Sequence, residues 1–148
     1  MKKRIFYSWQ SDLPNNTNRG FINTALDKAI EKIKSDTTYS IIPFLDRDTM
    51  GMAGSPDISL TIFEKINNSS VFVCDVSIVN NGEGNSRPTP NPNVLIELGY
   101  AVSKLGWECI ILVMNEVYGS VDLLPFDLRG RKVLTYSIST DAEKKGEE

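Results

Sequence analysis

The stretch Val71-Phe72-Val73-Cys74-Asp75-Val76 decides the fold class of this 148-residue chain. It is apolar almost throughout, and such runs are typical of strands in a parallel sheet that is covered on both faces. Four further runs have the composition of strands. They cover residues 4–8, 39–45, 109–114 and 132–137. Pro43 interrupts the second of them, which favours an edge position for that strand.

Helical patterns separate these strands. Apolar residues recur at helical spacing over residues 21–33, and Ser55 and Pro56 suit the cap and first position of a second helix. A third helix is predicted over residues 92–105, ending at Gly106. Strands that alternate with helices at these lengths imply βαβ units with right-handed crossovers. The sequence therefore predicts an α/β fold, with a five-stranded parallel sheet flanked by helices on both faces.

The remaining segments are predicted to be loops. Residues 80–93 carry three Pro and two Gly, and residues 118–130 have room for at most one short helical turn. Residues 140–143 look like a helix cap followed by a first turn. We interpret residues 1–148 as a single domain, and expect it to be the N-terminal module of a longer protein whose last helix is cut off.

Polar residues follow several of the strands at the point where each ends. They include Ser8, Trp9 and Gln10 at the end of the first strand, Asp46 after the second, and Ser77 after the third. In open α/β sheets the ligand crevice lies beyond the carboxyl ends of the strands. We therefore treat these five as candidate substrate-binding residues.

One acidic residue lies in an unusual context. Glu97 occurs near the start of the third predicted helix, directly beside Ile96 and Leu98. A charge among apolar residues costs free energy unless something compensates it. Glu97 is therefore a candidate for chemistry on a substrate that becomes positively charged. The alternative is a Glu at the helix edge with its carboxylate in water.

Composition narrows the classes of function. The net charge of -3 and the pI near 5.1 argue against a nucleic-acid surface. No apolar run reaches the ~18 residues of a membrane span, and no signal peptide is evident. Cys74 and Cys109 lie in apolar runs, as reduced thiols of a cytoplasmic protein do. We expect a cytoplasmic protein with no membrane or nucleic-acid partner.

The chain has no histidine. This argues against Ser-His and Cys-His catalysis and against HExxH zinc sites. Two cysteines far apart in sequence make a structural zinc site improbable. We therefore expect no metal and no bound cofactor. An enzyme of this composition works with carboxylates, hydroxyls, amides, Lys, Arg or Tyr.

Four motifs in this order resemble TIR (Toll/interleukin-1 receptor-like) domains, specifically the bacterial ones. IFYSW (5–9) is similar to their first strand, and FLDRD (44–48), followed by Gly51 and Gly54, to their second strand and BB loop. SVFVCDVS (70–77) resembles the next strand, and NVLIELGYA (93–101) the helix that bears the catalytic Glu of NAD-cleaving members. The resemblance covers nearly the whole chain and implies a TIR, flavodoxin-like fold.

The resemblance implies that NAD+ is a substrate, hydrolysed between nicotinamide and ribose. Glu97 would stabilise the positive charge of the ribose, and Trp9 would stack on a base. Gln10 and Ser11 stand where some members have basic residues, and Asp46 would border the pocket. Asn93 would bind substrate at a position where some members have Trp, so aromatic stacking is lost there. Nicotinamide leaves a pyridinium as a neutral molecule, so one carboxylate suffices without a general acid.

The resemblance also implies partners. It suggests self-association through the BB loop, residues 46–55, and neighbouring helices, with assembly switching catalysis on. It further suggests a fused sensor domain and a role in bacterial signalling or anti-phage defence. Two alternatives stay open. The segments 73–76 and 93–101 are also similar to nucleoside 2-deoxyribosyltransferases, in which Glu97 would be the nucleophile. The other alternative is a non-enzymatic TIR signalling module.

Overall fold

A five-stranded parallel sheet forms the centre of the computed structural model, which describes residues 1–46, 57–141 and 144. The strand order is β2-β1-β3-β6-β7, and every neighbouring pair is parallel. The strands are β1 (Lys2–Ser8), β2 (Ile42–Asp46), β3 (Val71–Asp75), β6 (Ile110–Asn115) and β7 (Val133–Tyr136). The predicted α/β fold is confirmed, and β2 takes the edge position that Pro43 favours.

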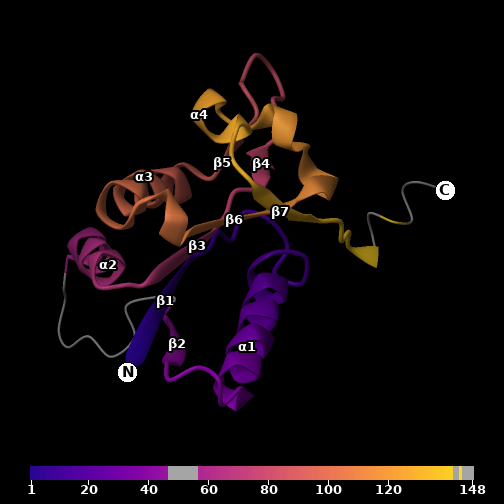
Figure 1. The fold of residues 1–148 in the computed structure, drawn as a ribbon. Helices are drawn as coiled ribbons and strands as arrows, with labels where there is room; N and C mark the ends of the chain where they lie inside the picture. Colours follow the sequence, from indigo (N-terminus) through magenta and orange to yellow (C-terminus); the bar gives the residue numbers. More distant parts are fainter. Residues whose placement is uncertain (47–56, 142–143, 145–148) are drawn as a thin grey trace.

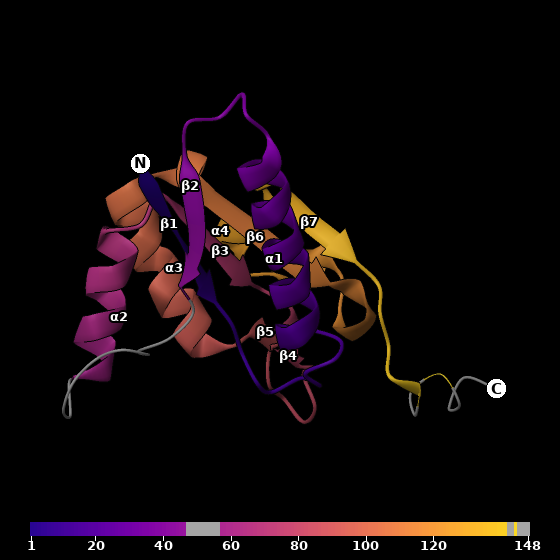
Figure 2. The same cartoon turned by 90° about the horizontal axis from the view of Figure 1, so that it is seen from below.

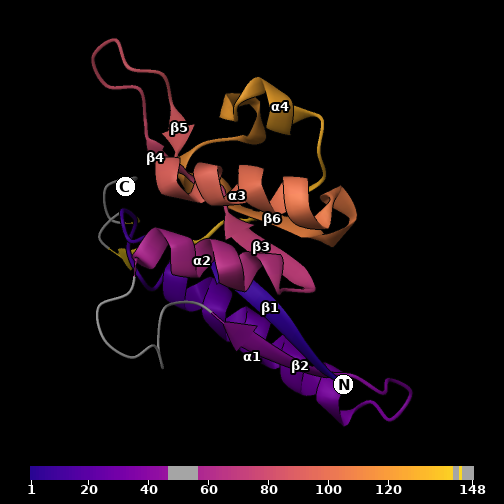
Figure 3. The ribbon, with the colours of Figure 1, turned by 90° about the vertical axis from the view of Figure 1, so that its left-hand side faces the viewer.

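Helices cover both faces of this sheet (Figure 1). α1 (Arg19–Ser35) lies on one face, as the view in Figure 2 shows. The other face carries α2 (Ile58–Asn67), α3 (Pro92–Leu105) and the short α4 (Phe126–Arg129). Helices α2 and α3 lie side by side, which Figure 3 makes plain.

The buried side chains form two separate hydrophobic cores, one on each face of the sheet. On the face of α2 and α3, Phe6 stacks on Phe72 with ring centres 5.9 Å apart, and both side chains are buried. On the face of α1, Tyr7 and Val73 pack with Ile22. Because successive strand residues point to opposite faces, the near-continuous apolar pattern of β1 and β3 fills both cores.

The boundaries of two helices differ in how well the sequence predicted them. α3 has the predicted bounds and ends at Gly106, whose φ of 80° suits glycine. α2 begins at Ile58, and its N-cap is Asp57, whose side chain accepts a hydrogen bond from the Leu60 N–H at 2.9 Å. The predicted cap, Ser55, lies outside the described residues.

The segment predicted as a loop before α3 contains a second, small sheet. β4 (Ile78–Asn80) pairs antiparallel with β5 (Thr89–Pro90). Short 3-10 turns η1 (Trp107–Cys109), η2 (Glu116–Tyr118) and η3 (Val121–Leu123) complete the described chain. Both cysteines are free thiols. None of the described helices combines the length and apolar character that crossing a bilayer requires.

Candidate functional site

Glu97 lies on the border of the buried face of α3. The helix begins after Asn91, whose side-chain oxygen accepts hydrogen bonds from two N–H groups of the first turn, at 2.8 and 3.2 Å. Val94 and Ala101 are buried against the sheet. Glu97 follows Val94 by three positions and precedes Ala101 by four, so it shares their side of the helix. The helix thereby directs this carboxylate toward the carboxyl end of β1.

The Glu97 carboxylate meets a single hydroxyl from that strand end. The Ser8 Oγ donates a hydrogen bond to Glu97 Oε2 at 2.6 Å, a length typical of a bond to an ionised carboxylate. Burial raises the pKa of Glu97 above its usual range, and the Ser8 hydrogen bond opposes this rise. Within the described part of the chain, Glu97 forms no ion pair with Lys or Arg. Its charge therefore has a hydrogen-bond donor but no counter-ion there.

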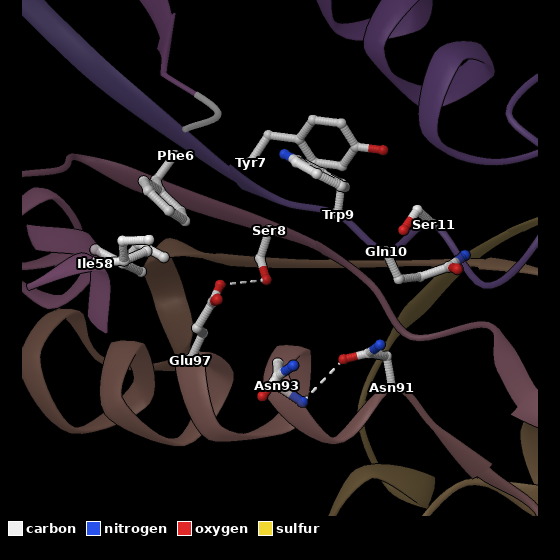
Figure 4. Close-up of a pocket in the computed structure, with 11 residues that line it drawn as sticks. Phe6, Tyr7, Ser8, Trp9, Gln10, Ser11, Ile58, Asn91, Asn93 and Glu97 are labelled. Atoms are coloured by element: carbon white, nitrogen blue, oxygen red, sulfur yellow. Dashed lines mark hydrogen bonds between the residues drawn. The ribbon is translucent and has the colours of Figure 1, made fainter. Parts of the chain in front are cut away.

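The carboxylate borders a cavity of about 370 Å³ at the carboxyl end of β1 (Figure 4). This places it at the sheet edge where an open α/β fold binds ligands. Of the candidate residues taken from the sequence, the cavity gathers Ser8, Trp9, Gln10, Asn93 and Glu97.

Trp9 has a cation against its ring. The Arg19 guanidinium, at the first residue of α1, lies 3.4 Å from the ring centre. This contact is a cation–π interaction. Arg19 occupies one face of the indole, so a stacked base would use the opposite face. No sequence pattern marked Arg19, because the contact depends on how the loop after β1 folds back.

Gln10 lines the cavity, but its side-chain amide is already engaged. The Nε2 donates to Asp75 Oδ2 at 2.9 Å, and the Oε1 accepts from the Leu13 N–H at 3.0 Å. Asp75 is fully buried and also accepts from Asn18 Nδ2 (2.9 Å) and the Ser77 N–H (3.0 Å). Asp75 thus caps the following turn and holds the loop after β1 in place.

Two candidate residues lie elsewhere. Asp46 forms ion pairs with Arg4 (3.2 Å) and Lys65 (3.0 Å), and it does not line the cavity. Ser77 is fully buried, where its hydroxyl accepts from Asn18 Nδ2 at 3.0 Å and from the Asn115 N–H at 2.8 Å. Asp46 is the last residue of β2 and Ser77 follows β3, but the polar atoms of both side chains bind other residues of the fold. We assign neither of them a substrate contact.

Apart from Ser11, which the TIR resemblance had marked, the other residues of the cavity carried no functional signal in the sequence. Ser11 and Asn91 add polar groups, and Phe6, Ile58 and Ile62 add apolar surface. Only the cap position of Asn91 ahead of Pro92 marked it, and that pattern indicates a helix start. Such residues come together through strand order and helix packing, which periodicity does not determine.

The site contains little that suits metal or thiol chemistry. Among the described residues, no three His, Cys, Asp or Glu side chains gather closely enough to hold a metal ion. Cys74 is fully buried, and burial raises the pKa of its thiol well above the usual range. A thiol in that state is a poor nucleophile. Among the described residues that line the cavity, Glu97 carries the one carboxylate.

Comparisons with known proteins bear on the fold. The chain matches no protein-family model and no curated protein. It is similar to a solved structure described as a 2-desoxiribosyltransferase from Leishmania mexicana, with a TM-score of 0.51 and 16% sequence identity over 89% of each chain. At this identity the likeness supports the α/β architecture. The resemblance to TIR domains stays a prediction.

Proposed function

We propose that the protein breaks the N-glycosidic bond of a nucleoside or nucleotide, with Glu97 facing the anomeric carbon. The observation that carries this proposal is the half-buried Glu97 carboxylate at a cavity. It accepts a hydrogen bond from one hydroxyl and forms no ion pair with any described Lys or Arg. Glycosidic cleavage passes through a cation-like sugar. A carboxylate fixed in a partly dehydrated cavity stabilises such a charge as it develops.

The carboxylate can act in two ways. It can attack the anomeric carbon, so that the bond to the base breaks as a glycosyl ester forms, which water or a second base then resolves. It can instead stabilise the sugar cation while water attacks and releases a proton. Among the described residues that line the cavity, Glu97 is the one acidic group. This favours a base that leaves without help from a second carboxylic acid.

Two substrate classes fit this chemistry. Transfer of a 2-deoxyribosyl group between bases draws support from the likeness in fold to the 2-desoxiribosyltransferase. Cleavage of NAD+, as in TIR enzymes, draws support from the single carboxylate, because a pyridinium leaves as a neutral base. Arg19 contacts the cavity-lining Trp9 without lining the cavity itself, and it would be a cation near a phosphate of that substrate bound beside Trp9.

A product assay tests the proposal. The purified protein is incubated with NAD+, and separately with thymidine or deoxyadenosine plus a second free base, and free bases and new nucleosides are identified by mass spectrometry. Release of free nicotinamide would identify cleavage of NAD+, and formation of a base-exchanged nucleoside would identify transfer of the 2-deoxyribosyl group. The Glu97→Gln variant supplies the background. If no substrate releases base above that background across a concentration series, the proposal is wrong and the non-enzymatic module gains support.

Assembly-dependent activation remains a separate proposal. It rests on the TIR resemblance, and most of the BB-loop segment, residues 47–55, lies outside the described residues. Mass action favours an assembled form at high protein concentration. The concentration series in the product assay therefore also tests it, because specific activity would rise with protein concentration if assembly switches the enzyme on.

A further inference from the structure

The cavity around Glu97 has two unlike ends. Gln10, Ser11 and Asn91 lie at one end, and Phe6 and Ile58 lie at the other, with Glu97 and Ser8 between them (Figure 4). A ligand that fills the cavity therefore meets polar groups on one side of the carboxylate and apolar groups on the other. This gradient gives the site a direction along which a substrate with two unlike parts can be aligned.

A second hollow continues from the apolar end, between α2 and α3. It has a volume of about 300 Å³, at the lower end of the range for small-molecule sites. Its apolar walls come from Ile58, Ile62 and Phe63 on α2 and from Ile96 on α3. Ile58, Ile62, Asn93 and Glu97 line both hollows, so the second is continuous with the first at the carboxylate.

We call this second hollow the α2/α3 groove. Two of its apolar wall residues are largely exposed to solvent. Ile58 is 62% exposed and Ile96 is 61% exposed. Single exposed apolar residues are common on protein surfaces. Here the two side chains border the same groove, Ile58 from α2 and Ile96 from α3. The candidate catalytic carboxylate of Glu97 lines this groove as well. No Lys or Arg is among the described residues that line the groove.

We infer that the α2/α3 groove binds the departing base of the substrate, an uncharged planar heteroaromatic ring. This inference rests on the proposed function, which places the anomeric carbon at Glu97. The sugar and its polar substituents then occupy the end with Ser11 and Asn91. The ring of the base packs against the apolar walls of the groove. Asn93, which lines both hollows, offers an amide donor and acceptor to the polar edge of the base.

The groove also favours bond breaking when the substrate is a pyridinium nucleotide. The base carries a positive charge before cleavage and none afterwards. Among the described residues that line the groove, Glu97 is the one carboxylate, and the apolar walls disfavour a charged ring relative to a neutral one. The groove therefore binds the base better as the bond breaks than before, and such differential binding lowers the barrier.

Inhibition by free base tests the groove. Free nicotinamide and free adenine are titrated as inhibitors of base release by the wild-type protein and by Ile58→Ser and Ile96→Ser. Loss of such apolar contacts is expected to weaken inhibition by roughly tenfold. Leu60→Ser is the matched control, because Leu60 is 58% exposed on α2 and does not line the groove. Equal inhibition of all four proteins would overturn the inference.

A binding experiment separates this inference from the proposed function. Amide chemical shifts of the Glu97→Gln protein are followed by NMR as nicotinamide or adenine is added, with no turnover required. Shifts concentrated around Ile58 and Ile96, and lost in Ile96→Ser, support the groove as a base site even if no substrate is cleaved. Absence of such shifts would overturn the inference that the groove binds the base. The role of Glu97 would still be tested separately by the product assay. The ring that binds distinguishes pyridine from purine substrates.

Discussion

Replacing Ser8 by Ala removes the hydrogen bond that the ionised Glu97 carboxylate receives. That bond is 2.6 Å long and comes from a buried hydroxyl. Hydrogen bonds to charged groups contribute roughly 1.5–3 kcal/mol, and the lower end applies because Glu97 is half-buried. The lost energy belongs to the ionised form, so the pKa of Glu97 rises further in Ser8→Ala. Since the reaction requires the carboxylate, activity falls as pH falls through that pKa.

The acid limb of the pH profile is therefore expected to lie at higher pH in Ser8→Ala than in the wild type. The measurement is kcat/KM for base release from acid to neutral pH. Ser11→Ala is the control, because it removes a hydroxyl from the same cavity without touching the Glu97 bond. Superimposable acid limbs for the wild type and Ser8→Ala, or a limb displaced to lower pH, would refute the reasoning.

Three further substitutions have expected effects on stability. Burial raises the pKa of Glu97 in the folded protein, so the stability linked to its protonation is lost as pH rises through that pKa. Glu97→Gln should therefore raise Tm at neutral pH, with a gain that shrinks in acid, and a pH-independent loss of Tm would contradict this. Asp75→Ala removes the acceptor of three buried hydrogen bonds and should cost about 3 kcal/mol or more in urea unfolding, whereas exposed Asp122→Ala should cost under about 0.5 kcal/mol. Asp46→Asn weakens two ion pairs and should lower the free energy of unfolding by about 1 kcal/mol with KM unchanged. A raised KM would indicate that Asp46 contacts the substrate.

The sheet and its covering helices could be predicted because both depend on local patterns. The apolar run at residues 71–76 marks a strand buried on both faces, and Gly106 marks the end of α3. The β4–β5 pair could not be predicted in the same way. It joins segments of three and two residues across a loop that contains Gly82, Gly84 and Pro88, and neither segment is long enough to show a strand pattern.

The site was predictable only in part, for a related reason. Glu97 stands out because a charged residue occurs among apolar neighbours on a helix. Its partner Ser8 lies 89 positions away, and their contact follows from the packing of α3 against β1. Gln10 shows why the sequence was not sufficient. Its position at a strand end suggested a substrate contact, but its side-chain amide donates a hydrogen bond to the buried Asp75. Strand ends indicate where a site lies but not which side chains are free to use.

The most direct test of the account compares kcat/KM for base release between the wild type and Glu97→Gln, with Tm measured for both. A unit charge about 4 Å from the developing sugar cation, at an effective dielectric constant near 20, stabilises it by about 4 kcal/mol. That corresponds to roughly a thousandfold in rate. The account predicts a folded Glu97→Gln protein with a loss of that order. A folded variant that keeps near wild-type turnover would contradict the central claim.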